Sequence, residues 1–554
     1  MMKDACQSAC AQTRRASGFL QRILSRPAAA LTCLMLALSL GPGTGRSPAA
    51  EDTNALPKRP MALEDCFRLA LEQNLDLRIE QENPTFSRIS VELARAVYDP
   101  DFIASARYDY KDDGRFTRVV TSSQLQIVTN NNQLVITNVP TGTTVERGIN
   151  LINRAQTYRS GISGLGPMGL NYDLSANITD SSTSGNANTA GSTLGTVGLT
   201  LTQPLLRDFM IDAPRYNIAI ARNQLKVSEL VLRQRIIEVL TAVEQAYYEL
   251  IFARENVRVT TEGLRLAERL SADDQKRVQI GMIPRLDEKQ SASQVAARQA
   301  DLSAALRSLA TAQNNLKRLI TTEYRDLHDA QLDPTMTLNG DAQFLDLQTS
   351  WAKGLAERPD LQQAKLNVER QGITLKFYKN QRLPSLDVSG TYGHGASGVS
   401  TREINDVFGD WRSGEKPFWG VGATFGIPLG NRAARERYRQ GKVTADQLVL
   451  LLKQKEESIL IEIDEAVNAV RTTREQVQST AAARRFAEEA LSAEQKKLDS
   501  GKSTSFVVLQ LQRDLTSASS QEIRALADYN KAQAELSRAE GTTLERRRIN
   551  LIVK

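Results

Sequence analysis

The chain has 554 residues, of which 41% are apolar, 24% charged and 5% aromatic, and its formal net charge is +6. Residues 1–49 contribute +5 of that charge, so the remainder is nearly neutral and gives no electrostatic reason to expect nucleic-acid binding. After residue 50 no run of about twenty apolar residues occurs, so we expect no transmembrane helix there.

The first fifty residues are typical of an export signal. A basic stretch ends at Arg26, an apolar stretch runs from Pro27 to Leu40, and Ser-Pro-Ala at 47–49 is a small-residue cleavage site. A short membrane anchor is the alternative, but the apolar stretch is too brief to span a bilayer. We therefore predict a signal peptide over 1–50. Cys33 follows a threonine where a lipidation signal needs a smaller residue, which disfavours a lipid anchor without excluding one.

The rest of the chain carries one pattern twice. Asp76 and Asp360 occupy similar settings, and a proline follows each after 24 residues, at Pro100 and Pro384. Each proline ends a helical pattern and begins an alternating one. Internal duplication of this kind determines an architecture, so it takes precedence over local signals.

Two later landmarks recur in the same order. Pro204 and Pro428 close the alternating regions. Gly281 and Gly501 end the helical patterns that follow, and from Val243 and Ile463 to these glycines the two copies keep a constant offset of 220 residues. Each copy therefore runs helix, strands, very long helix, turn, helix. The predicted repeats are 61–330, with a long insertion at 111–195, and 331–554.

The two very long helices are predicted over 214–280 and 432–500. At 1.5 Å per residue each would be roughly 100 Å long. Their apolar residues recur every seven positions, as at Ile236, Val243 and Leu250, which indicates helices packed side by side along a seam. An isolated two-stranded coiled coil is the alternative, and the strands beside these helices disfavour it.

Shorter helices are predicted over 62–98 and 284–320. Two such pieces stacked end to end match the length of one long helix, so alternating single helices and stacked pairs can close a cylinder. Pro84 interrupts the first helix, where we expect a local kink. Cys66 is the only cysteine after the signal, so no intrachain disulfide is expected, and we predict a small buried side chain there.

The alternating regions predict strands. Tyr172 and Leu174 fall on one side of such a strand, while Asp173 and Ser175 fall on the other. A soluble sandwich would need a second sheet, for which each chain has too few strands. We therefore favour a membrane β-barrel shared between subunits, which leaves no open edge in lipid.

The strand number stays open at this level. The first copy has 60 more residues between its prolines than the second, which allows two or four strands. Four strands would leave 165–169 as the inner turn and 111–150 and 179–195 as outer loops. The four strands would be 102–110, 153–162, 169–178 and 196–203. A trimer would then have twelve or eighteen strands.

With its duplicated pattern, its Leu-Thr-Gln-Pro-Leu-Leu at 201–206 and its paired glycines, the chain resembles the TolC family of outer-membrane efflux proteins over nearly all of 61–545. The resemblance implies a mainly α-helical homotrimer, in which a β-barrel in the outer membrane continues into a long coiled-coil tunnel in the periplasm. It also implies a periplasmic adaptor (a membrane fusion protein) and an inner-membrane pump or exporter as partners, and contact with outer-membrane lipid.

The resemblance implies that the turns after the long helices form the periplasmic tip that contacts the adaptor. Its residues would be Ile280, Gly281, Met282, Ser500, Gly501 and Lys502. Each glycine also has a purely structural explanation, because it permits the reversal of the helix. Pro100, Pro204, Pro384 and Pro428 would mark the helix–strand junctions.

Some family members hold the tip shut with acidic residues and salt bridges. Asp287 matches an acidic position of that gate, whereas Gln510 and Val507 stand where acids are expected and Ser503 where a base is expected. Lys502 is a candidate replacement for that base. The possible gate is thus Asp287, Lys502 and Gln510, and a solvated helix face is the alternative for each charge.

No motif for catalysis, a metal or a cofactor occurs. His328 and His394 are the only histidines, and no phosphate loop or nucleophile elbow is present. We therefore predict no enzyme, and the family resemblance implies a passive gated exit duct for small molecules in a tripartite efflux system. A type I protein secretion channel and a non-conducting coiled-coil envelope protein are the alternatives.

Overall fold

The computed structural model describes residues 58–549 except 131–132, 186–187, 341–344 and 400–403. The predicted signal peptide, residues 1–50, lies outside the described residues. The chain divides into Met1–Ala55 and Leu56–Lys554, and all elements below belong to the second unit. Among the described residues, no helix combines the length and apolarity needed to cross a membrane.

Two very long helices, α3 (Ala213–Gln279) and α9 (Arg432–Asp499), are the longest elements of the fold. The Asp212 carboxylate begins α3 by accepting a hydrogen bond of 3.1 Å from the backbone N–H of Arg215. The predicted heptad residues Ile236, Val243 and Leu250 are all buried. The sequence period therefore places one continuous apolar seam along the helix.

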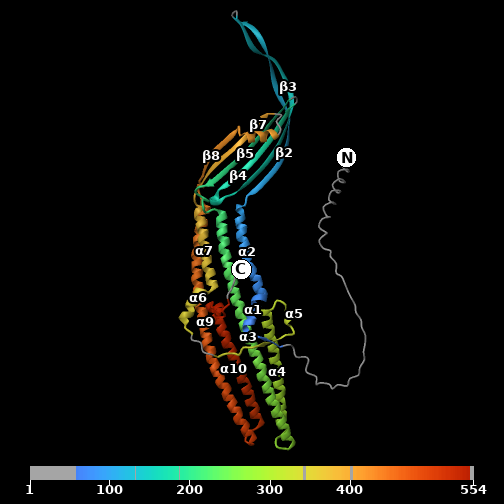
Figure 1. The fold of residues 1–554 in the computed structure, drawn as a ribbon, viewed down its shortest axis with the longest axis vertical. Helices are drawn as coiled ribbons and strands as arrows, with labels where there is room; N and C mark the ends of the chain where they lie inside the picture. Colours follow the sequence, from blue (N-terminus) through green and yellow to red (C-terminus); the bar gives the residue numbers. More distant parts are fainter. Residues whose placement is uncertain (1–57, 131–132, 186–187, 341–344, 400–403, 550–554) are drawn as a thin grey trace, which may run out of the picture. The chain divides into compact units, whose positions relative to one another are not determined.

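Shorter helices pack in pairs along each long helix. Helices α2 (Leu75–Arg95) and α4 (Arg285–Ile320) pack on α3, while α7 (Pro359–Asn380) and α10 (Ser505–Glu540) pack on α9. Helix α3 also contacts α7 and α10. In Figure 1, α2 and α7 lie next to the strands, and α4 and α10 lie at the opposite end of the long helices. The predicted alternation of single helices and stacked pairs is confirmed.

The first opening helix is interrupted at a different residue from the one predicted. It divides at Asn74 into α1 (Leu63–Gln73) and α2, and α2 continues through Pro84. The Asn74 side chain accepts a hydrogen bond from the Leu77 N–H and donates one to the Leu319 carbonyl, which caps the new helix and ties it to α4. The second copy divides in the same way at Arg358, between α6 (Leu347–Glu357) and α7.

Short elements lie around these breaks. Strand β1 (Lys58–Met61) pairs in parallel with β6 (Gln331–Pro334), and α5 (Tyr324–Leu327) and α11 (Thr543–Arg546) complete this region. Cys66 is buried here, as predicted, within a core cluster shared by α1, α3 and α4. The Tyr247 hydroxyl donates a hydrogen bond of 3.0 Å to the Met61 carbonyl and so joins β1 to α3.

Among the described residues, six strands form one antiparallel sheet in the order β2-β3-β4-β5-β7-β8. Four come from the first copy and two from the second, which decides the strand number that the sequence left open. The strands are β2 (Asp101–Asn130), β3 (Gln133–Leu165), β4 (Asn171–Gly185), β5 (Asn188–Pro204), β7 (Ser385–Val399) and β8 (Pro417–Gly426). The predicted inner turn lies between β3 and β4, at Pro167–Gly169.

The segments 111–150 and 179–195 are mostly strand, so their prediction as outer loops was wrong. Strands β2 and β3 stay paired from Asp101 with Ser163 to Asn130 with Gln133, whereas β4 pairs with β3 only from Ile152 onward. The outer part of this hairpin is therefore a two-stranded ribbon, visible beyond the sheet in Figure 1. A hairpin satisfies its backbone hydrogen bonds internally, so polar, threonine-rich sequence can extend a strand where a loop was expected.

The two faces of the sheet differ in polarity, as the alternation predicted. One face carries Tyr172, Leu174 and Ile178 on β4, while the other carries polar side chains such as Asp173, which forms an ion pair of 3.4 Å with Arg159. A helix that was not predicted, α8 (Ile404–Ser413), connects β7 to β8 and packs on the apolar face.

Candidate functional site

The two hairpin turns at the ends of α3 and α9 have the same backbone geometry. The N–H of Gly281 donates to the Val278 carbonyl at 3.0 Å, and the N–H of Met282 donates to the Arg277 carbonyl at 2.8 Å. This pair of bonds is a Schellman motif, and it requires the left-handed conformation that Gly281 adopts, with φ of +74°.

The second turn repeats that geometry 220 residues later. The N–H of Gly501 donates to the Leu498 carbonyl at 3.1 Å, the N–H of Lys502 donates to the Lys497 carbonyl at 2.8 Å, and Gly501 also has φ of +74°. A Cβ at either glycine would meet no atom within 4 Å, so backbone conformation rather than space favours glycine here. Ser500, like Ile280 in the first turn, caps the preceding helix.

Large apolar side chains project from these turns. Ile280 is 70% exposed and Met282 is 71% exposed, and Leu286 and Phe506 on the following helices are also exposed. Scattered exposed apolar residues need no explanation, but three at the end of the α3–α4 hairpin and a fourth at the equivalent end of the α9–α10 hairpin are typical of a surface that another protein covers.

The structure does not bring the three predicted gate residues into one cluster of charges within the chain. Asp287 lies half-buried in the first turn of α4, Lys502 is exposed, and Gln510 lines a groove between α4 and α10. In the described part of the chain, neither Asp287 nor Lys502 forms an ion pair.

A buried carboxylate that the sequence analysis missed connects the two hairpins. Asp274 on α3 is 0% exposed, and its Oδ1 accepts a hydrogen bond of 2.6 Å from the Ser505 hydroxyl at the start of α10. Its Oδ2 has no hydrogen-bond partner in the structure as described. Burial raises the pKa of Asp274, and the Asp287 carboxylate adds to the rise; the Ser505 and Ser291 hydroxyls and the charge of Arg277 offset it only in part.

The heptad pattern contained a signal for this residue. Extending the seam positions of Leu232 and Ile236 by sevens leads to Asp274 and Ser271, both of which are buried. A polar residue at a seam position is energetically costly, so its occurrence indicates a specific local role.

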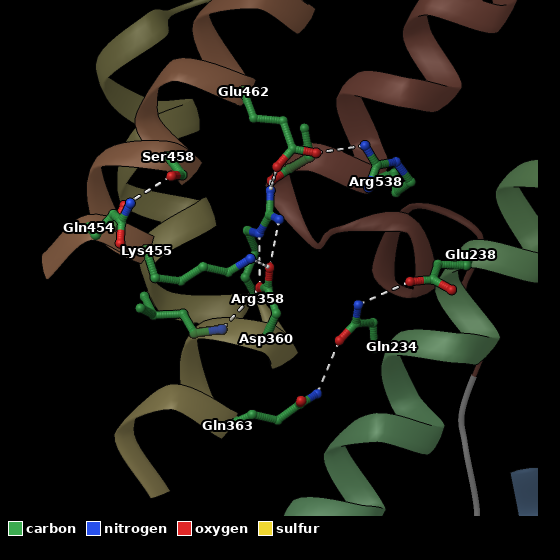
Figure 2. A network of polar contacts seen from close by, with 12 residues as sticks. Gln234, Glu238, Arg358, Asp360, Gln363, Gln454, Lys455, Ser458, Glu462 and Arg538 are labelled. Atoms are coloured by element: carbon green, nitrogen blue, oxygen red, sulfur yellow. Dashed lines mark hydrogen bonds and ion pairs between the residues drawn. The ribbon is translucent and has the colours of Figure 1, made fainter. Parts of the chain in front are cut away.

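A second polar network surrounds the helix break at Arg358. The Arg358 guanidinium donates two hydrogen bonds to Asp360, at 3.0 and 2.8 Å, one to Glu462 at 2.7 Å and one to the Ala539 carbonyl at 3.1 Å. Arg538 also contacts Glu462, at 2.6 Å. Figure 2 shows that these residues point toward one another; Arg358 lies in the break directly before α7, and its partners come from α7, α9 and α10.

The charges in this network hold one another ionised. Burial alone would raise the pKa of Asp360, but hydrogen bonds from Arg358 and Lys455 outweigh it and leave that pKa well below its usual range. Glu462 behaves in the same way: burial opposes its ionisation, and Arg358 and Arg538 lower its pKa. The network therefore joins three helices through full charges.

The internal duplication extends to these contacts. Lys455 forms an ion pair of 2.8 Å with Asp360, and Arg235 forms one of 3.1 Å with Asp76. The two aspartates are 284 residues apart and the two bases 220 apart, the offsets that the sequence landmarks indicated. The repeat is therefore a repeat of tertiary contacts as well as of sequence.

The four landmark prolines lie at the ends of the strands. Pro100 and Pro384 directly precede β2 and β7, Pro204 is the last residue of β5, and Pro428 follows the end of β8. Backbone hydrogen bonds join the residues after Pro204 to the start of β7. One of them, of 2.7 Å, runs from the Leu205 N–H to the Leu386 carbonyl.

The described residues contain no group of three or more histidine, cysteine, aspartate or glutamate side chains that could hold a metal ion. A comparison with curated proteins finds no match to the sequence. The family model for outer membrane efflux proteins matches residues 156–322 and 352–542, together more than half of the chain. The chain belongs to the outer membrane efflux protein family.

Solved structures share the fold of this outer membrane efflux protein. The CmeC outer membrane channel of Campylobacter jejuni is 15% identical, with a TM-score of 0.59 over 87% of this chain and 86% of its own. The outer membrane protein VceC of Vibrio cholerae is 16% identical, with a TM-score of 0.59 over 86% and 96%. The open state of the MtrE outer membrane channel of Neisseria gonorrhoeae is 16% identical, with a TM-score of 0.58 over 87% and 89%.

The resemblance to the TolC family and the expected fold class are confirmed, because the family model matches both copies and the solved relatives combine the same long helices with strands. This outer membrane efflux protein is an exit channel of the outer membrane. Its family and its solved relatives are channels and not enzymes.

Proposed function

We propose that three copies of this chain close into one passive, gated duct that spans the outer membrane as a β-barrel and crosses the periplasm as a helical tunnel. The single observation that carries this proposal is that the sheet ends in two free edges. Within the described residues, β2 and β8 each pair on one side only. Open edges are not tolerated in lipid, and β8 of one copy is antiparallel to β2 of the next. Six strands from each of three copies would make a barrel of eighteen.

The outermost helices support the same arrangement. Helix α2 exposes Ile79, Phe86 and Leu93, and helix α9 exposes Val443 and Leu450. Helix α3, which has neighbours on both sides within the chain, buries its apolar seam instead. The exposed apolar residues of α2 and α9 would therefore pack against each other across the contact between neighbouring copies, because they lie on opposite outer helices of one chain.

The duplication predicts which residues meet across that contact. Within one chain, α3 of the first copy packs on α7 of the second, and there Gln234 accepts a hydrogen bond of 3.0 Å from Gln363. Adding 220 to the first number gives Gln454 on α9, and subtracting 284 from the second gives Ile79 on α2. Gln454 of one copy should therefore lie against Ile79 of the next.

Disulfide cross-linking tests this arrangement. A chain with both Ile79→Cys and Gln454→Cys should give a non-reducing ladder that ends at the trimer. The native Cys66 is fully buried and should not compete. The matched control pairs Ile79→Cys with Glu475→Cys, about 30 Å further along α9, and should stay monomeric. A ladder that ends at the dimer, or no ladder at all, would contradict the threefold arrangement.

The hairpin turns are the surface that we propose for the periplasmic adaptor. The exposed side chains of Ile280, Met282 and Phe506 support it, because an adaptor would cover apolar area that water now contacts. Gly281, Ser500, Gly501 and Lys502 complete this surface, and Asp287, Lys502 and Gln510 would line the gate behind it. An inner-membrane pump would supply the energy for export of small molecules.

Conductance in planar lipid bilayers tests the duct itself. The purified trimer should insert and, at least in its open state, pass ions in discrete steps. A cross-linked trimer that never conducts under any voltage, salt or pH would instead indicate the non-conducting envelope protein. This outcome is separate from the cross-linking result, so assembly and transport are tested independently.

A further inference from the structure

Helix α8 lies on the apolar face of the sheet, near the outer ends of the strands that it follows and precedes. Its Val407 is buried against Ile178 of β4 and Ala396 of β7. A Cβ on Gly195 would clash with the Val407 side chain and lie 3.2 Å from Trp411, so the missing side chain is what lets α8 approach the sheet this closely.

A groove of about 430 Å³ lies between α8 and the strands. Its floor consists of small side chains on β2 and β4, and its walls are aromatic. The residues that form it include Ala104, Ala106 and Ala176 on the floor and Tyr158, Phe408 and Trp411 on the walls. Phe408 remains 54% exposed although it is apolar, so α8 does not cover the groove completely.

The face that bears this groove is the one that the proposed barrel turns toward lipid. The opposite face carries the Arg159–Asp173 ion pair and a hydrogen bond of 3.2 Å between Thr200 and Thr391, as expected of a water-filled lumen. On the apolar face, Tyr392 and Trp419 are exposed on the strands next to α8. Exposed aromatic residues on that face are expected of a barrel surface that contacts lipid.

We propose that the α8 groove binds one acyl chain of a lipid in the outer leaflet. The inference rests on the proposed function, because it needs the apolar face to contact lipid. The small alanine side chains of the floor leave a hollow that the side chains of the adjacent strands do not fill. The atoms that line an unfilled hollow lose van der Waals contacts, which a hydrocarbon chain would restore. The volume suits one hydrocarbon chain between aromatic walls rather than a whole lipid.

Tryptophan quenching tests the proposal in the intact trimer. The chain has three tryptophans, and Trp351→Phe with Trp419→Phe leaves Trp411 as the only emitter. In vesicles of phosphatidylcholine with bromine at mid-chain, Trp411 should lose emission relative to vesicles without bromine. A variant that keeps only Trp419 serves as the positive control for the lipid face. One that keeps only Trp351, on α6 in the helical part, should be unaffected.

Filling the groove separates a bound chain from general contact with lipid. Ala176→Leu places a larger side chain on the floor and should abolish the quenching of Trp411 while that of Trp419 is unchanged. Ala423→Leu, on the same face of β8 but away from α8, is the matched control and should leave both signals unchanged.

The outcomes discriminate between the two proposals. Quenching of Trp419 without quenching of Trp411 overturns the groove but leaves the lipid-facing barrel intact. Quenching of neither, with Trp411 quenched by aqueous iodide, places α8 in a water-filled lumen and overturns both. Quenching of Trp411 that persists in Ala176→Leu shows general lipid contact and overturns a specific acyl-chain site.

Discussion

Removing the Arg358 side chain should weaken the helical part measurably, and the structure determines by how much. In Arg358→Gln, Asp360 loses two charge-assisted hydrogen bonds and Glu462 loses one, in a place where the Arg358 side chain is only 8% and that of Asp360 only 14% exposed. A buried charge left wholly unpaired costs about 3–5 kcal/mol. Here Lys455 still contacts Asp360 at 2.8 Å, so we expect the smaller loss of about 2–3 kcal/mol.

The matched control is Arg235→Gln in the first copy. It breaks the ion pair with Asp76, which is equivalent by repeat to the pair between Lys455 and Asp360 but is far more exposed, with Asp76 at 61%. Exposed pairs contribute about 0–1 kcal/mol, so this variant should unfold almost as the parent does.

Urea titration of the far-ultraviolet circular dichroism in detergent would report both changes as shifts of the unfolding midpoint. Equal midpoints for Arg358→Gln and Arg235→Gln would refute the view that burial makes this network important.

The loss of stability at acidic pH gives a second readout of the same network. Because the pKa of Asp360 is lowered in the fold, its contribution to stability is present above the unfolded pKa and is lost as the pH falls through the folded one. In Arg358→Gln the folded pKa of Asp360 lies closer to the unfolded one, so that loss should be smaller and should be complete at a higher pH.

Three further predictions concern other parts of the chain. The pKa of Asp274 is raised in the fold, so its contribution to stability is full below the unfolded pKa and is lost as the pH rises through the folded pKa. Asp274→Asn should therefore raise the urea unfolding midpoint more at neutral than at acidic pH. An equal change at both pH values would count against a raised pKa of Asp274. Leu174 is 47% exposed on the apolar face, so Leu174→Arg should oppose insertion into lipid vesicles by about 2–4 kcal/mol at mid-bilayer. The control, Ser175→Arg on the polar face, should insert normally. Equal insertion of the two variants would argue against lipid contact at Leu174. Replacing 117–148 by Asn-Gly should leave the cross-linked trimer and its conductance unchanged, because β3 pairs with β4 only from Ile152 onward; loss of the trimer would give the ribbon a part in assembly.

Much of the fold could be predicted because its signals are periodic and repeated. The heptads around Val243 specify a helix buried along one side, and the alternation around Leu174 specifies a strand with two unlike faces. The landmarks Asp76 and Asp360 were recognised as equivalent, and the structure gives them equivalent cationic partners. The turns at Gly281 and Gly501 were located to the residue because only glycine adopts that conformation readily.

The candidate site was predicted only in part. Sequence spacing located the turns, since a helix reversal depends on residues that are neighbours in the chain. It did not find the bond between Asp274 and Ser505, which are 231 residues apart, although the seam position of Asp274 was a signal. Nor did it find that Asn74, rather than Pro84, divides the opening helix, because the decisive partner of Asn74 is the Leu319 carbonyl on another helix.

By itself, the sequence determined the two long helices, the strands next to the landmark prolines, which side of each is apolar, and that the chain is built twice, because those properties depend on neighbours along the chain. Only the tertiary structure decided that the first copy contributes four strands, that α8 folds back over Gly195, and that Arg358 joins three helices. Each of these depends on which distant segments come into contact, and the free energy of such contacts is settled by burial and geometry that no local pattern records.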